Sequence, residues 1–576
     1  MFEFQIQSCL CAEMNTEEYI ANAKGLVDYI ANYYTTIENR KVKPDVQPGY
    51  LSKLLPKQAP TEGESFHEIF QDFEKFVMSG VTHWQSPHMH AYFPALSSYP
   101  SMLAEMLSDA INCLGFTWAS SPACTELEMV VMDWLALATG MPDKYMYSSR
   151  GKGGGIISGT CCEATLTAML AARKITIEDQ KCCVGQKTLA DADILSRLVA
   201  YTSDQAHSSV EKAAMISLVK IRMLPTDSDY VLRGGTVKNA ILEDRNKGLI
   251  PFFVCITLGT TGCCAFDNLE EIGPVCAEEG LWLHVDAAYA GTAFLCPEYR
   301  RFLKGVQYTN SFAFNPSKNM LTNFDCTAFW IDDATALHKT FCAYPQMPLY
   351  LSHNHGDAAI DFMNWQIPLS RRFRSLKIWF VMRSYGTLGL QNHVRSQIRL
   401  AQYFENLVAA HRDYEIAAPR ILGLVVFRLK GHNELTKTLL SKILLNGKIF
   451  MVPADLKGKF VLRFSVTSPQ TTEATIFEDW ELITALGAEV LDECHQFVPP
   501  IRLSPEYLPD DSEEERKSVY GEKTNGHWES ESEDCERIGD ISPFSTSDAS
   551  PKKTFPTDEA RYRNCLIRAF DKLSVD

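Results

Sequence analysis

The sequence predicts an α/β fold with a mostly parallel sheet in a large domain, followed by a smaller α+β domain. Over residues 100–387, short β-branched or aromatic runs alternate with helical segments, as in a parallel sheet with crossover helices. The run 250–257 is followed by a helical pattern and then by the run 281–285, which predicts one βαβ unit. Two later strand-like runs, 423–429 and 460–466, follow a helical stretch and belong to the smaller domain.

A helical arm is predicted in front of the large domain. Asn15 and Glu18 have the spacing of a capping box, and apolar residues follow at intervals of three and four, so one face of this first helix is expected to be buried. A second amphipathic stretch runs from Phe66 to Phe76. Such an arm often wraps a partner subunit, and packing on its own subunit is the alternative.

These patterns divide the chain of 576 residues into four predicted parts. The arm covers 14–98, the large domain 99–393 and the small domain 394–498. The remainder, 499–576, loses apolar periodicity, and 15 acidic but only 6 basic residues lie between Pro505 and Asp558. We expect this segment to be an acidic, mostly disordered tail.

Charge and hydropathy exclude several classes of partner. With 55 basic and 71 acidic residues the net charge is −16, which disfavours binding to nucleic acid or anionic lipid. No apolar run approaches the ~18 residues of a membrane-spanning helix. The first 14 residues contain Glu3 and Glu13 but no Lys or Arg, unlike a secretory signal. We therefore expect a cytosolic protein without an integral membrane segment.

Cysteine and histidine spacings do not predict a metal site. The 18 cysteines are scattered or directly adjacent, and no CxxC motif occurs, so reduced and mostly buried thiols are expected. The pairs His88 with His90 and His353 with His355 lack a third ligand at a recognisable spacing. No metal is predicted.

Three features together indicate a site for a phosphorylated aldehyde cofactor. The segment 150–166 has five glycines before a helix, whose first N–H groups could hold a phosphate, although such a run is more often a flexible connector. Asp286 follows an apolar strand directly, where its carboxylate either faces a cation or caps a helix. Lys318 follows another strand-like run. Considered alone, Lys318 is a surface cation. Considered together with the glycine-rich segment and Asp286, it is a candidate Schiff-base lysine.

Longer motifs resemble those of the group II pyridoxal-phosphate amino-acid decarboxylases, which have the aspartate-aminotransferase-like fold (type I). The resemblance extends from about Glu17 to Gly487 and includes the segments 83–88, 116–128, 203–209, 284–291 and 315–318. Within the family, the segments 315–318, 368–375 and 466–472 are similar to the animal histidine decarboxylase branch. The aromatic-amino-acid branch has His in place of Ser317 and Gly in place of Ser370.

The resemblance implies a homodimeric enzyme that uses pyridoxal 5′-phosphate to convert L-histidine to histamine and CO₂. Lys318 would carry the cofactor covalently, Asp286 would keep its ring nitrogen protonated, and His207 would stack on the ring. For His207 the alternative is a satisfied buried histidine. The other implied cofactor contacts are Cys161, Cys162, Thr261, Ala288 and Asn315.

The resemblance also implies how substrate is held. Tyr350, in the polar loop 341–357, would return a proton to the substrate α-carbon, and the loop would act as a lid. The substrate pocket would be lined by Tyr92, Phe93, His207 and Ser370.

Three residues depart from the family pattern. Asn319 stands where Trp is usual, Phe93 where histidine decarboxylases usually have Tyr, and Cys162 where a serine normally bonds the phosphate. A thiol is a poorer hydrogen-bond donor than a hydroxyl, so weaker cofactor binding is expected.

Two other functions stay open at this point. One is an aromatic L-amino-acid decarboxylase acting on DOPA or 5-hydroxytryptophan. The other is a catalytically silent interaction protein, in which the acidic tail is the functional part and Asn319 and Cys162 mark lost catalysis.

Overall fold

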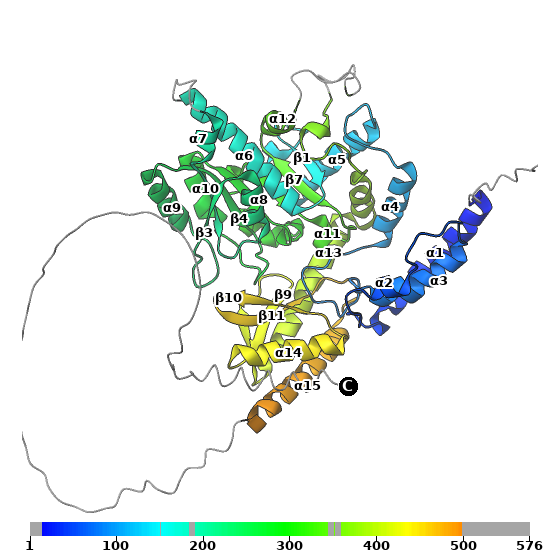
Figure 1. Ribbon diagram of the computed structural model, residues 1–576. Helices are drawn as coiled ribbons and strands as arrows, with labels where there is room; N and C mark the ends of the chain where they lie inside the picture. The colour runs from blue at the N-terminus through cyan, green and yellow to red at the C-terminus, as the bar shows by residue number, and fades with distance from the viewer. Residues whose placement is uncertain (1–13, 150, 184–189, 344–350, 352–358, 498–576) are drawn as a thin grey trace, which may run out of the picture. The chain divides into compact units, whose positions relative to one another are not determined.

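The computed structural model describes residues 14–149, 151–183, 190–343, 351 and 359–497. In this part of the chain, helices surround a seven-stranded sheet and cover a separate four-stranded sheet (Figure 1). The predicted acidic tail and the predicted proton donor Tyr350 lie outside the described residues.

The large sheet is mostly parallel, which confirms the predicted fold class. Its strands, in spatial order, are β1 (Gly154–Ser158), β7 (Thr327–Ile331), β6 (Ser311–Phe314), β5 (Trp282–Asp286), β4 (Ile250–Thr257), β2 (Leu198–Ser203) and β3 (Lys220–Leu224). The five strands from β6 to β3 run parallel, whereas β7 pairs antiparallel with both β6 and β1.

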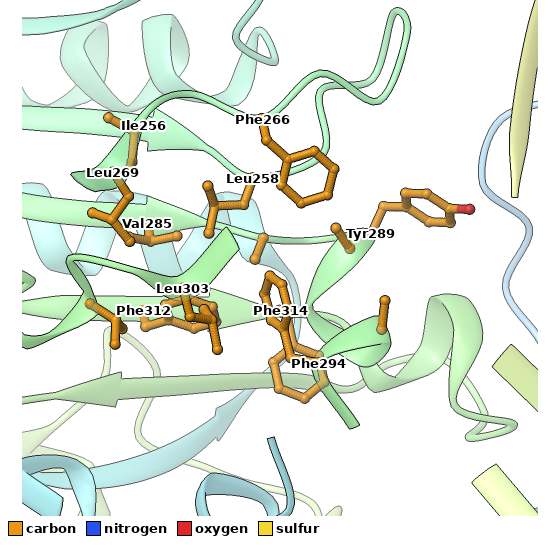
Figure 2. Packing of buried hydrophobic residues seen from close by; sticks show 14 of the residues in the cluster. Ile256, Leu258, Phe266, Leu269, Val285, Tyr289, Phe294, Leu303, Phe312 and Phe314 are labelled. Atoms are coloured by element: carbon orange, nitrogen blue, oxygen red, sulfur yellow. The ribbon is translucent and has the colours of Figure 1, made fainter. Parts of the chain in front are cut away.

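Both faces of the large sheet are buried under helices. One face packs against α6 (Cys161–Cys183), α8 (Ser209–Ser217) and α12 (Thr335–Phe341), and the other against α5 (Pro122–Thr139), α9 (Gly234–Asn246) and α10 (Leu269–Glu279). Successive residues of a strand alternate between the two cores: Phe253 faces α6, whereas Val254 faces α9. Figure 2 shows the second core, where Val285 and Phe312 pack together. Burial on both faces explains the continuous apolar runs of these strands.

The predicted βαβ unit is confirmed as β4, α10 and β5. Strands β4 and β5 pair in parallel, with Phe253 opposite Trp282. The side chain of Asn268 caps α10 by accepting the N–H of Glu271 at 3.1 Å. Helix α10 ends at Gly280, which has a left-handed backbone with φ of 68°.

The glycine-rich segment contains strand β1 in addition to the turn before α6. A Cβ on Gly153 would lie 1.9 Å from the carbonyl oxygen of Lys144, and one on Gly155 would lie 2.5 Å from Cε of Met132. Glycine therefore allows this edge strand to pack closely against its neighbours. Close packing, and not flexibility, explains the glycines at these positions. The predicted helix follows directly as α6.

The small sheet is antiparallel. In spatial order its strands are β10 (Val452–Leu456), β11 (Lys459–Ser465), β9 (Leu424–Leu429) and β8 (Tyr414–Ala418), and it packs with α14 (Asn433–Asn446) and α15 (Glu473–Phe497). The strand-like runs of the sequence predict the central strands β9 and β11 but not the edge strands, which are only partly buried and include Pro453. Helix α13 (Ser375–Ala410) is kinked at Gly386, which has a non-helical backbone with φ of 63°, and its second part continues across residue 393, where a domain boundary is predicted.

The helical arm begins as predicted but does not bury the face expected. Helix α1 (Thr16–Thr36) has the full capping box, with the N–H of Glu18 donating to Oδ1 of Asn15 at 2.9 Å. The shorter helices α2 (Tyr50–Leu54) and α3 (Phe66–Asp72) follow, and α4 (Tyr99–Ile111) leads into the large domain. No residue of α1 is buried, and Tyr19 is 58% exposed. The first half of its apolar face, which includes Ile20 and Val27, is therefore exposed in the described part of this chain, whereas Tyr29 packs against Phe70 and Tyr33 against His83.

The histidines His88 and His90 bind a carboxylate instead of converging on a metal position. Nδ1 of His88 lies 2.7 Å from Oδ1 of Asp479, and Nε2 of His90 lies 2.9 Å from Oδ2 of the same side chain. The described residues contain no group of three or more His, Cys, Asp or Glu side chains placed to hold a metal ion. Among the described helices, none is both long and apolar enough to cross a membrane.

Candidate functional site

The candidate site lies at the carboxyl ends of three adjacent parallel strands. In the register of β4, β5 and β6, Thr257 is opposite Asp286, and Asp286 is opposite Ala313. Ligands of open α/β sheets bind beyond this edge. Lys318 follows β6 by four residues in the short helix α11 (Pro316–Asn319), so the register brings it to the same edge as Asp286.

Asp286 is a buried carboxylate without an ion-pair partner among the described residues. It is only 4% exposed, and its Oδ1 accepts the backbone N–H of Ala288 at 2.9 Å. Its strand neighbour His284 approaches Thr165 of α6, with 3.3 Å between Nε2 and Oγ1, so this side of β5 faces α6. A buried carboxylate without a counter-ion is costly, which favours a ligand that presents a positive charge or a proton.

Lys318 is half-buried and lies beside an aromatic side chain. Its backbone N–H donates to the carbonyl of Asn315 at 3.0 Å, which fixes the turn after β6. Its Nζ lies 5.8 Å from the ring centroid of Phe93, within the range of a cation–π contact. The amine therefore lies among protein groups, as a lysine that reacts with an aldehyde requires.

His207 follows β2 and shares the electrostatic environment of Asp286 and Lys318. Its Nδ1 accepts the backbone N–H of Ser209 at 3.2 Å, so the neutral ring carries its proton on Nε2. Desolvation lowers the pKa of His207, the charge of Asp286 opposes that shift, and the charge of Lys318 adds to it. Sequence reasoning placed these three side chains in one site, and their mutual electrostatic influence is consistent with that placement.

The start of α6 offers N–H groups for an anion. Oγ1 of Thr160 accepts the N–H of Glu163 at 3.2 Å, and the Glu163 carboxylate accepts the N–H of Gly159 at 3.1 Å. The remaining first-turn N–H groups have no acceptor within the helix, and their dipoles favour negative charge. Cys161 is buried, and Cys162 in the same turn is exposed.

Cys161 ties the start of α6 to the turn that carries Lys318. Its Sγ lies 2.9 Å from Oδ1 of Asn315, and the same oxygen accepts the hydroxyl of Thr327 at 2.7 Å. Desolvation raises the pKa of the Cys161 thiol well above its usual value, with the charge of Asp286 acting in the same direction. The thiol is therefore a neutral hydrogen-bond donor to Asn315.

Phe93 is held in an aromatic stack that sequence reasoning did not find. Its ring lies 3.7 Å from the ring of Tyr289, with 11° between the planes. The guanidinium of Arg463, from β11 of the small sheet, lies 4.9 Å from the Phe93 centroid. Tyr289 belongs to the motif that contains Asp286 and could have been found there, whereas Arg463 carries no local signal because it reaches Phe93 only through the tertiary fold.

The structure does not bring every predicted residue into contact. Thr261, Tyr92 and Ser370 are exposed, and Ala288 is half-buried beside the core on the α6 side of the sheet. Within the described residues, no hydrogen bond or ion pair joins Thr261 or Ser370 to Lys318, His207 or Asp286. Their roles remain predictions.

Comparisons with known proteins identify the family of the chain. Residues 48–430 match the pyridoxal-dependent decarboxylase conserved domain. Histidine decarboxylase of Mus musculus is 57% identical over 83% of this chain and 72% of that protein, and aromatic-L-amino-acid decarboxylase of Rattus norvegicus is 51% identical over 83% and 99%. The crystal structure of Oryza sativa TDC with PLP and tryptamine superposes with a TM-score of 0.78, at 35% identity over 83% of this chain and 99% of that one.

These similarities cover the residues that build the site. The matched range contains the glycine-rich segment, His207, Asp286 and Lys318, and it contains all seven strands of the large sheet. The chain belongs to the family of pyridoxal-dependent decarboxylases.

Proposed function

We propose that this protein is a pyridoxal-phosphate-dependent L-histidine decarboxylase that forms histamine and CO₂. The observation that supports this proposal is the difference in sequence identity between two groups of relatives. Four histidine decarboxylases are 55–57% identical to it, whereas the aromatic-L-amino-acid decarboxylases are 50–51% identical over the same share of the chain. Ser317 and Ser370 follow the first group in the sequence motifs.

The residues at the strand ends fit pyridoxal phosphate. The donor set includes a half-buried amine at Lys318, a buried carboxylate at Asp286 that has no ion pair within the described residues, and N–H groups at the start of α6. The amine matches the aldehyde of the cofactor, the carboxylate matches a ring nitrogen that takes a proton, and the N–H groups match the phosphate. When bound, the cofactor supplies the electron sink for the bond that breaks as CO₂ leaves.

Each side chain has a separate role in the proposed site. The amine of Lys318 would hold the cofactor through its aldehyde, and the buried carboxylate of Asp286 would keep a proton on the ring nitrogen. His207 would pack on the ring, with its own proton on Nε2 because Nδ1 accepts the N–H of Ser209. Asn315, with Cys161 bound to its amide oxygen, lines the ring substituents.

Substrate binding and proton return involve a second set of residues. Tyr92, Phe93 and Ser370 line the substrate pocket in this proposal, with Phe93 held in place by its stack on Tyr289. Tyr350 returns the proton to the α-carbon after CO₂ has left. A phenol hydroxyl is a proton donor, as this step requires.

We further propose that the enzyme is a cytosolic homodimer in which the arm packs on the partner subunit. Helix α1 exposes Tyr19, Ile20, Leu26 and Val27, and a helix of this apolar character gains stability by covering that face. Sedimentation equilibrium of the full chain and of a variant with charged residues at Ile20 and Val27 tests this, because the variant should be monomeric.

A product assay tests the proposed reaction. The purified protein with saturating pyridoxal phosphate is given histidine, DOPA and 5-hydroxytryptophan separately, and the amines are quantified. The expected result is histamine as the main product. Faster formation of dopamine or serotonin would instead support an aromatic-amino-acid decarboxylase, and the absence of both amine products and cofactor absorbance would support a silent interaction protein.

A further inference from the structure

A fully buried ion pair joins α5 to the segment before α13. Glu128 is 0% exposed and Arg371 is 3% exposed. Nη2 of Arg371 donates to Oε1 of Glu128 at 2.6 Å, across 243 residues of sequence. Both residues lie in segments that carry the family resemblance, 116–128 and 368–375, but their pairing exists only when the two segments meet.

The pair binds both backbone groups of one residue in the edge strand β1. The N–H of Ile157 donates to Oε1 of Glu128 at 2.7 Å, and the carbonyl of Ile157 accepts Nη2 of Arg371 at 3.2 Å. Because β1 pairs with β7 on its other side only, these groups would otherwise lie unpaired at a buried sheet edge. Glu128 and Arg371 therefore take the place of a neighbouring strand.

The same guanidinium also takes part in hydrogen bonds within the loop that contains Ser370. Nε of Arg371 donates to Oε1 of Gln366 at 2.8 Å, and Nε2 of Gln366 donates to the carbonyl of Pro368 at 2.5 Å. Ser370 is adjacent to Arg371, and Ile157 precedes the turn at Gly159 that leads into α6. One side chain thus touches both the loop proposed to select substrate and the strand that leads to the proposed phosphate site.

Stability alone does not account for this arrangement. Oε2 of Glu128 and Nη1 of Arg371 are buried and have no hydrogen-bond partner within the described residues. A buried pair that leaves polar atoms unsatisfied is often no more stable than apolar residues of similar volume. A role in positioning, for which charge and a forked donor are needed, explains why these residue types are present.

We propose that Glu128 and Arg371 are positioning residues that hold the 366–371 loop against β1, and so couple substrate preference to cofactor affinity. The part concerning substrate preference rests on the proposed function, whereas the part concerning cofactor affinity does not. The coupling requires one guanidinium to reach Gln366, Glu128 and Ile157 together, which its planar fork allows.

The test uses the full-length holoenzyme and the variant Arg371→Lys, whose single ammonium keeps the charge but cannot reach all three acceptors. Two quantities are measured: the ratio of kcat/KM for histidine to that for DOPA, and the pyridoxal-phosphate concentration that half-saturates the cofactor absorbance. We expect the ratio to fall and the half-saturating concentration to rise, each by about tenfold or more. The matched control is Arg372→Lys, an exposed neighbour that pairs with Glu105 and Asp109 and should change neither quantity.

A second variant keeps the test valid if Arg371→Lys does not fold. The double substitution Glu128→Leu with Arg371→Met replaces the ion pair by apolar side chains, which buried sites often tolerate. It should fold and show the same two changes. Folded variants with the parent's ratio and the parent's cofactor affinity would overturn the inference. A parent enzyme that prefers DOPA would overturn the proposed function alone, because the cofactor titration would still decide the role of the pair.

Discussion

Replacing Asp267 by asparagine should make the stability of this protein less dependent on pH. Asp267 is 3% exposed and follows the loop after β4, next to the candidate site. Its Oδ2 accepts the N–H of Thr257 at 2.8 Å, and its Oδ1 accepts the N–H of Leu232 at 2.9 Å. The carboxyl group therefore anchors the end of β4 to the segment before α9.

Burial raises the pKa of Asp267 to about 7, although the two backbone hydrogen bonds act in the opposite direction. The folded protein then keeps this proton up to about pH 7, whereas the unfolded chain loses it near pH 4. Stability from this group is complete at low pH and is lost as the pH rises between those two values. At about 1.4 kcal/mol per pH unit, the loss between about pH 5.5 and 7.5 is about 2 kcal/mol.

Urea unfolding of the parent and of Asp267→Asn at matched pH values measures this effect. Asparagine can accept only one of the two N–H groups, so the variant should be less stable by about 1–3 kcal/mol at low pH. That difference should shrink by about 2 kcal/mol as the pH rises from about 5.5 to 7.5, because only the parent loses stability through this group. Asp229→Asn, at an exposed position, is the control. A difference in the free energy of unfolding between the parent and Asp267→Asn that stays constant over this pH range would refute the reasoning.

Four further substitutions test the proposed site. Lys318→Ala should abolish the cofactor absorbance and nearly all decarboxylation, and full activity would contradict the assignment. Cys162→Ser should lower the half-saturating cofactor concentration, because a hydroxyl donates better than a thiol to an anion; an unchanged titration would remove Cys162 from the phosphate site. Tyr350→Phe should slow amine formation and allow oxygen to yield aldehyde and ammonia, so an unchanged amine yield without aldehyde would exclude Tyr350 as the proton donor. Ser370→Gly should shift the ratio of kcat/KM for histidine to that for DOPA toward DOPA by about tenfold, from one lost polar contact and a wider pocket, and a constant ratio would show that Ser370 is not the selector.

Local sequence patterns determined the fold class and the main chemistry of the candidate site. The apolar runs of β4 and β5 predicted a parallel pair, and parallel pairing puts residues that follow such strands at one edge of the sheet. Asp286 and Lys318 could therefore be placed together before the structure was considered. The capping box at Asn15 was equally readable, because its hydrogen bonds join residues only three apart.

Only the tertiary structure decided which distant groups meet. Glu128 and Arg371 are 243 residues apart, and His88 and Asp479 are 391 apart, so no local period records either contact. The edge strands β8 and β10 of the small sheet were missed for a related reason: a half-exposed strand depends on its neighbour, and Pro453 in β10 argues against a strand when the sequence is considered alone. The exposed first half of the apolar face of α1 is the clearest case, since its periodicity predicts burial but cannot say which surface provides it. Sequence periodicity specifies what a segment can bury, and packing between segments determines where it is buried.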